Sequence, residues 1–183
     1  MCIVIVDLEA TCWEDDRRLE RMEIIEIGAL KLKGKSLKTI NEFSSFVRPI
    51  SEPKLSGFCK ELTTIQQCDV DKADDFKAVF AKFLDWMGSS SYRIASGGEY
   101  DIKQLATDCK RHNIHFPQKF RTKHINLKKV FASQRKIRTC GMVAALKMLG
   151  IPLEGIHHRG IDDARNIARI AQVILQNACL QVA

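Results

Sequence analysis

The feature that most constrains the fold is an apolar run at the start of the chain. Residues 1–11 read MCIVIVDLEAT, and such a β-branched run is typical of a strand buried on both faces of a sheet. Asp7 and Glu9 stand where the run ends. Because side chains alternate along a strand, both carboxylates point to the same side. Two like charges this close repel each other unless a cation lies between them, although a solvated strand end would carry the same residues.

Composition indicates a single globular domain spanning residues 1–183, with 45% hydrophobic and 28% charged residues. No apolar stretch approaches the length of a membrane span, and the N-terminus lacks the basic region and cleavage site of a signal peptide. We therefore expect an intracellular, cytoplasmic protein without membrane association. The seven cysteines are odd in number and never spaced CxxC, which argues against a disulfide framework or a zinc site. The sequence does not indicate an oligomeric state.

The net charge of +7 is unevenly distributed along the chain. Residues 7–26 contain eight acids and three arginines, whereas residues 103–147 contain twelve Lys and Arg and one acid, Asp108. This asymmetry is typical of an acidic cation site beside a surface that attracts phosphates. A merely solvated basic face remains the alternative.

The first third of the chain predicts three strands. After a polar loop, residues 22–33 and 37–47 have strand character, and Gly34 and Lys35 between them form a turn signal. Consecutive strands with short links predict an antiparallel meander. The first strand, as the most apolar, is expected to be central.

The remaining two thirds are predominantly helical. Residues 56–59 are interpreted as a loop and residues 92–95 as a short strand broken by Gly97 and Gly98. Amphipathic spacing and terminal signals predict helices over residues 62–67, 74–87, 101–112, 126–132, 139–149 and 161–176. The order of elements predicts an α/β fold with a mixed sheet.

Two further positions extend the acidic pair. Asp101 lies just past the short strand, on the first turn of a helix, where α/β folds place groups that face ligands. The stretch HHRGIDDARN at residues 157–166 puts histidines in a loop before a helix whose first turn is acidic. His158 with Asp163 and His157 with Asp162 have the same spacing. A transition-metal site at the two histidines ranks lower, because no second nitrogen or sulfur cluster supports it.

These three stretches, in this order, resemble the motifs of the DEDDh 3′-to-5′ exonucleases. The resemblance runs nearly end to end and is strongest to the three-prime histone mRNA exonuclease branch, through DLEATCWE, FVRPISEPKLSGFCKELTTIQQ and HHRGIDDARNIARI. It implies a ribonuclease H-like fold, with a five-stranded mixed sheet flanked by helices.

The resemblance also implies a metal site and a catalytic group. It assigns two divalent cations, Mg²⁺ or Mn²⁺ by their preference for oxygen ligands, to four carboxylates: Asp7, Glu9, Asp101 and Asp163. His158 is implied as the general base and Glu9 as a second catalytic residue. Asp163 is preferred to Asp162 because a small residue, Ala164, follows it, as is common in the family.

The substrate residues implied by the resemblance are Leu8, Ala10, Thr11, Phe58 and Tyr100. Tyr100 stands where the histone mRNA enzyme has a tryptophan, and ordinary core packing is the alternative role for Phe58. The implied function is a metal-dependent exoribonuclease that releases nucleoside 5′-monophosphates from single-stranded RNA or 3′ overhangs. A DNA exonuclease with the same site is the alternative. A non-catalytic nucleic-acid-binding module ranks lower, because all five catalytic positions carry suitable residues.

Overall fold

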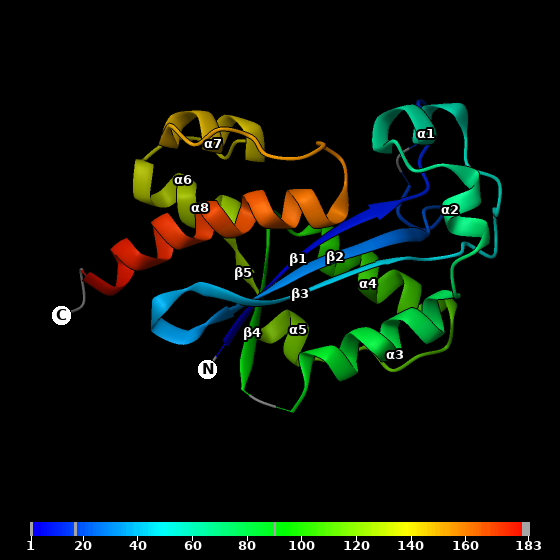
Figure 1. The fold of residues 1–183 in the computed structure, drawn as a ribbon, viewed down its shortest axis with the longest axis horizontal. Coiled ribbons are helices and arrows are strands. Elements are labelled where there is room, and N and C mark those ends of the chain that lie inside the picture. Colours follow the sequence, from blue (N-terminus) through cyan, green and yellow to red (C-terminus); the bar gives the residue numbers. More distant parts are fainter. Residues whose placement is uncertain (1, 17, 90, 181–183) are drawn as a thin grey trace.

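The structure is a computed structural model that describes residues 2–16, 18–89 and 91–180. Its centre is a five-stranded sheet in the order β3-β2-β1-β4-β5 (Figure 1). The strands are β1 (Cys2–Ala10), β2 (Ile24–Lys33), β3 (Lys38–Phe46), β4 (Tyr92–Ser96) and β5 (Ile125–Asn126). β1 pairs antiparallel with β2 and parallel with β4. The predicted mixed sheet, antiparallel meander and central first strand are therefore confirmed; residue 1 of the predicted strand lies outside the described residues.

Helices cover both faces of the sheet (Figure 1). One face packs against α3 (Phe76–Met87), α4 (Tyr100–Arg111) and α5 (Lys119–Thr122), and the other against α6 (Leu127–Arg135), α7 (Met142–Leu149) and α8 (Gly160–Leu180). Across the described residues, no helix combines the length and the apolar character needed to cross a bilayer.

The alternation of β1 explains why its sequence is apolar on both sides. Val4, Val6 and Leu8 belong to the core under α3 and α4, whereas Ile5 belongs to the core under α8. Asp7 and Glu9 continue the Ile5 side of the strand. The packing of β1 thus aims both carboxylates toward the α8 layer.

The prediction around residues 56–67 is wrong. Residues 57–59 are not a loop but the start of α1 (Gly57–Thr63), because the Ser56 hydroxyl caps the helix by accepting from the Cys59 N–H at 2.9 Å. The next helix, α2 (Gln67–Asp71), begins where the predicted 62–67 helix was expected to end. Phe58 is consequently a helix residue that α1 holds in place.

Other predicted elements are confirmed with shifted ends. Gly150 ends α7 in the left-handed conformation with φ of 67°, as its predicted cap position requires. The short α5 and the two-residue β5 were not predicted, since neither is long enough to show periodicity. The six described cysteines are free thiols, and the side chain of Cys179 lies outside the described residues.

The start of α8 packs directly on the sheet at two glycines. A Cβ on Gly28 of β2 would lie 2.0 Å from the backbone carbon of Gly160, the first residue of α8. A Cβ on Gly160 would lie 3.2 Å from the Asp7 carbonyl oxygen. Only residues without side chains permit this approach.

We expect Gly28→Ala to push α8 off the sheet and to lower the free energy of unfolding by about 1–3 kcal/mol, the usual cost of overpacking. Urea denaturation measures this change. Gly57→Ala is the control, because nothing lies within 4 Å of a Cβ at Gly57. Equal unfolding midpoints for Gly28→Ala and the wild type would contradict the glycine contact.

Candidate active site

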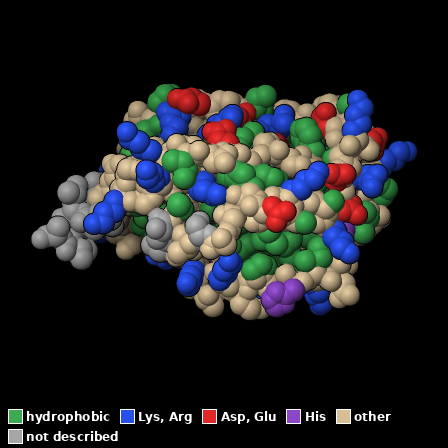
Figure 2. All heavy atoms as spheres, turned by 60° about the horizontal axis from the view of Figure 1, so that its bottom comes forward, with side chains coloured by type: hydrophobic (Ala, Val, Ile, Leu, Met, Phe, Trp, Pro, Cys, Tyr) green, Lys and Arg blue, Asp and Glu red, His purple; other side chains and the backbone are tan. Residues whose placement is uncertain are grey.

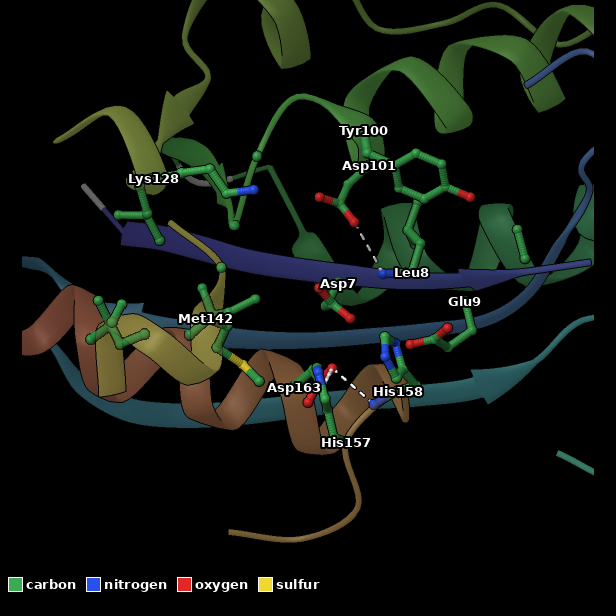
Figure 3. A pocket seen from close by; sticks show the side chains of 18 of the residues that line it. Asp7, Leu8, Glu9, Tyr100, Asp101, Lys128, Met142, His157, His158 and Asp163 are labelled. Atoms are coloured by element: carbon green, nitrogen blue, oxygen red, sulfur yellow. Dashed lines mark hydrogen bonds and ion pairs between the residues drawn. The ribbon is translucent and has the colours of Figure 1, made fainter. Parts of the chain in front are cut away.

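A cavity of about 400 Å³ opens at the ends of β1 and β4, between α4 on one side and α6, α7 and α8 on the other (Figure 3). Its lining includes all four predicted carboxylates and both histidines of the loop before α8. Because β1 and β4 are parallel, the residues that follow each strand meet at the same edge of the sheet.

Three carboxylates meet in this cavity. Asp7 and Glu9 from β1 and Asp163 from the first turn of α8 each offer an oxygen within 4.8 Å of the others. Asp163 is buried, and its Oδ1 has no hydrogen-bond partner among the residues that the structure describes. A buried carboxylate oxygen without a partner is costly, and a cation among the three carboxylates would satisfy it.

Asp101 completes the acidic set from the opposite side. It lies buried on the first turn of α4, and its Oδ1 accepts the Leu8 N–H at 3.2 Å. Figure 3 shows Asp101 and Asp163 on opposite sides of β1, with Asp7 between them. All four predicted carboxylates therefore line one cavity, three of them with oxygens within 4.8 Å of one another and Asp101 on the opposite side of β1.

Burial and mutual repulsion oppose ionisation of Asp7 and Glu9. Burial, followed by the charges of neighbouring carboxylates, holds the pKa of Asp7 well above its usual range and raises the pKa of Glu9 to about 9. Burial also raises the pKa of Asp101 to about 6, although hydrogen bonds to its carboxylate oppose the shift. Crowded oxygen ligands of this kind fit a hard divalent cation, which would offset the repulsion.

The loop before α8 is anchored to Asp163. Asp163 Oδ2 lies 2.8 Å from His157 Nδ1 and accepts the His158 N–H at 3.0 Å. The two imidazoles stack with centroids 3.9 Å apart, and His158 has a left-handed backbone with φ of 64°. This conformation is unfavourable for a non-glycine residue and is common at functional sites. Burial, with the neighbouring His157, lowers the pKa of His158 and favours its neutral form.

Asp162 points elsewhere. It accepts the Ile156 N–H at 2.9 Å and pairs with Arg165 at 3.0 Å, and it does not line the cavity. The ambiguity between the two aspartates is therefore resolved in position: Asp163 joins Asp7 and Glu9. Both histidines line the cavity, so position alone does not separate their roles.

Glu26 was missed by the sequence reasoning. It lies on β2 directly opposite Glu9, is buried, and accepts from Arg159 Nε at 3.2 Å and from the Gly160 N–H at 3.0 Å. The Gly160 bond caps the first turn of α8, while Arg159 adjoins His158. The available signal was a single acid, Glu26, inside the apolar stretch IIEIGAL at residues 24–30.

Only some of the residues expected to contact nucleic acid lie at the cavity. Leu8, Ala10 and Tyr100 line the cavity, and Phe58 lines an adjoining hollow together with Tyr100. Phe58 is 38% exposed, which excludes the core-packing alternative. Thr11 lines neither space, since it is buried and its hydroxyl accepts the Glu23 N–H at 2.9 Å.

Three of the twelve basic residues at positions 103–147 form ion pairs within the protein. Arg111 binds Asp108, and both Lys103 and Lys129 pair with Glu99. On the face shown in Figure 2, Lys and Arg side chains are spread among acidic and apolar ones rather than gathered into one patch.

Comparison with known proteins decides the family. The family described as RNase T exonuclease matches residues 4–171. The chain belongs to the RNase T exonuclease family. Among curated relatives, 3′-5′ exoribonuclease 1 of Rattus norvegicus is 37% identical over 97% of this chain, and the 3′-5′ exonuclease Snipper of Drosophila melanogaster is 30% identical over 97%. The aligned region is 54% of the rat protein and 70% of Snipper, so the chain spans about half the length of the first of these relatives.

A solved relative extends the likeness to the fold. The nuclease domain of 3′hExo, a DEDDh family member bound to rAMP, superposes with a TM-score of 0.90 at 36% identity, covering 97% of this chain and 93% of that one. The ribonuclease H-like fold and the resemblance to DEDDh exonucleases are thus confirmed. Exonucleases of this family depend on divalent metal ions, which agrees with the carboxylate cluster.

The raised pKa values make a prediction about the metal-free protein. A carboxyl group whose pKa is higher in the folded than in the unfolded state stabilises the fold most at low pH. That contribution is lost as pH rises from about 4 through the folded-state pKa values of about 6 for Asp101 and about 9 for Glu9. In EDTA the melting temperature should therefore fall between pH 5 and pH 9, and Mg²⁺ should restore it.

Asp7→Asn removes one of the repelling charges and should raise the metal-free melting temperature at pH 8 while reducing the Mg²⁺-induced increase. Differential scanning fluorimetry with EDTA or Mg²⁺ measures both effects. Asp162→Asn is the matched control and should retain the Mg²⁺ response. A normal Mg²⁺ response in Asp7→Asn would remove Asp7 from the metal site.

Proposed function

We propose that this chain is a metal-dependent 3′-to-5′ exoribonuclease that releases nucleoside 5′-monophosphates from single-stranded RNA or 3′ overhangs. The observation that carries the proposal is that four carboxylates, three of them buried, and a histidine loop line one cavity. A single exonuclease domain over residues 1–183 and an intracellular, cytoplasmic location stay predictions.

Asp7, Glu9, Asp101 and Asp163 are the residues that would hold the metal, and we propose two ions, Mg²⁺ or Mn²⁺. When bound, divalent ions stabilise the charge on the attacking and leaving oxygens of an in-line displacement at phosphorus. The buried, unpartnered Asp163 Oδ1 and the repulsion within the cluster support this assignment.

His158 is the proposed general base. Its lowered pKa keeps the imidazole neutral near pH 7, so that it can take a proton from the attacking water. The water oxygen bonds to phosphorus, and the bond to the 3′-oxygen of the preceding nucleotide breaks. A nucleoside 5′-monophosphate and a new 3′-hydroxyl result. Glu9 is the proposed second catalytic residue, because its carboxylate faces the same point as Asp7 and Asp163.

The preference for RNA rests on the relatives. The rat relative is named an exoribonuclease. A solved 3′-exonuclease that recognises the 3′ end of the histone mRNA stem-loop is 34% identical over 97% of this chain, with a TM-score of 0.91.

The test is degradation of 5′-labelled RNA and DNA oligonucleotides of one sequence in Mg²⁺, Mn²⁺ or EDTA. We expect a ladder shortening from the 3′ end, faster for RNA, absent in EDTA and blocked by a 3′-phosphate. Faster degradation of DNA would reassign the substrate. Rapid cutting of circular RNA would show that no end is needed and would overturn the exonuclease assignment.

Removal of the proposed base should slow the chemistry with little effect on metal binding. His158→Ala should lower kcat by about 10²- to 10⁴-fold, the usual contribution of a general base. His157→Ala should be mild, because Asp163 keeps its bond from the His158 N–H. Single-turnover kinetics measure both, with Mg²⁺-induced thermal shifts as the check on metal binding. A larger loss in His157→Ala would exchange the two roles.

Stacking on Phe58 should contribute affinity that salt does not screen. An aromatic stack contributes about 1–3 kcal/mol per base, whereas phosphate contacts make log K fall with log salt by about 0.7 per contact on single strands. Phe58→Ala should weaken RNA binding without changing the slope of log K against log salt. Fluorescence anisotropy with Ca²⁺ in place of Mg²⁺ measures both quantities. Unchanged affinity would place the terminal base away from α1.

A further inference from the structure

We propose that the part of the cavity between α6, α7 and α8 binds the penultimate nucleotide of the substrate, with its phosphate on Lys128. This subsite rests on the proposed exonuclease function and assigns the path of the strand through the same cavity.

Figure 3 shows Asp7, Asp101 and Asp163 between Lys128 and Met142 on one side and Tyr100 on the other, so we treat the cavity as two arms that meet at these carboxylates. The first arm, here the terminal arm, is lined by Cys12, Met22, Leu62 and Tyr100 and adjoins the hollow under Phe58. The second, here the upstream arm, is lined by Gly97, Gly98, Leu127, Lys128, Phe131, Cys140, Gly141, Met142, Ala145, Ile167 and Ile170. A phosphodiester that reacts at the carboxylates has one nucleoside on each side, so each arm receives one.

Charge decides which nucleoside enters which arm. Among the described residues that line the cavity, Lys128 alone is a lysine or arginine, and it lies on the upstream arm. The 3′-terminal nucleoside carries no phosphate beyond the scissile one, whereas the penultimate nucleotide carries a further phosphate on its 5′ side. Lys103 lines the hollow that adjoins the terminal arm, but its ammonium is paired with Glu99. The upstream arm, which holds Lys128, is therefore the arm for the penultimate nucleotide.

Lys128 is held for this role at the start of α6. Its N–H donates to the Gly97 carbonyl at 3.2 Å, and its ammonium lies 3.9 Å from where a Cβ on Gly98 would be. Within the described part of the chain, no carboxylate lies within ion-pair distance of Lys128, whereas its neighbour Lys129 is paired with Glu99. Lys128 thus keeps an ammonium free for a phosphate.

The walls of the upstream arm can contact any nucleotide base and do not select one base over another. Leu127, Phe131 and Ile167 form a buried apolar floor, and the half-buried Met142 extends from α7 toward Asp163 (Figure 3). Apart from Lys128 and the Cys140 thiol, the described residues that line this arm offer no polar side chain to a base edge. Contact with a base face is tolerant of sequence, so we expect no base preference at the penultimate position.

The test compares two substrates of one enzyme. Single-stranded RNA needs both arms, whereas uridine 5′-(4-nitrophenyl phosphate) has nitrophenolate in place of the upstream strand. Lys128→Ala should lower kcat/KM for RNA about ten-fold or more beyond any loss for the ester, the scale of a hydrogen bond to a charged group. Lys129→Ala is the matched control and should alter the two substrates alike. Met142→Ala should also act on RNA more than on the ester, and Met142→Leu should restore the ratio.

Each outcome is decisive for the subsite. Equal losses on both substrates in Lys128→Ala would make Lys128 part of the metal site, and no loss on either would send the strand along another path. Both results would overturn the subsite while leaving the exonuclease intact. A wild-type enzyme that degrades RNA in neither Mg²⁺ nor Mn²⁺ would instead overturn the proposed function itself.

Discussion

Repulsion among buried carboxylates is the constraint on which the rest of the structure depends. Asp7, Glu9, Asp101 and Asp163 converge where little water can screen them, and the pKa values of the first three are raised by burial. Such a cluster opposes folding. The sheet offsets it by placing β1 at its centre, where apolar side chains on both faces are buried under helices. The long apolar run and the acids at its end are therefore parts of one arrangement.

The second requirement is that the start of α8 be held in a fixed position beside these carboxylates. Gly28 and Gly160 let the helix approach to backbone contact, and Glu26 accepts the Gly160 N–H at the start of the helix. That single anchor fixes Asp163, three residues later, and His158, two residues earlier. Glu26 lies opposite Glu9 on the neighbouring strand. The residue that fixes the start of α8 therefore also adds charge repulsion to Glu9.

The elements and residues that could be placed from the sequence are those that follow a local periodicity of the chain. Asp7 and Glu9 were placed correctly because a strand alternates strictly, and Asp101 because a helix start after a strand leaves few positions for a carboxylate. The start of α1 was missed because one hydrogen bond from Ser56, rather than any apolar pattern, makes residues 57–59 helical. The position of Glu26 beside the cluster and the burial of Thr11 away from the cavity were not foreseen, for a related reason. Their partners, Gly160 and Glu23, are fixed by how distant segments pack and by the pairing of β1 with β2.

The charge asymmetry seen along the sequence is larger than the charge asymmetry of the folded protein. Residues 103–147 hold twelve basic residues, yet several are occupied within the protein: Arg111 by Asp108, and Lys103 and Lys129 by Glu99. Of the described residues that line the cavity, one is a lysine, Lys128, and four are acids. The cavity alone would therefore repel a phosphate, and only a bound cation reverses the sign of its field. In the proposed function, catalysis and phosphate binding would therefore depend on the same ions, whereas stacking on the exposed rings of Phe58 and Tyr100 would not.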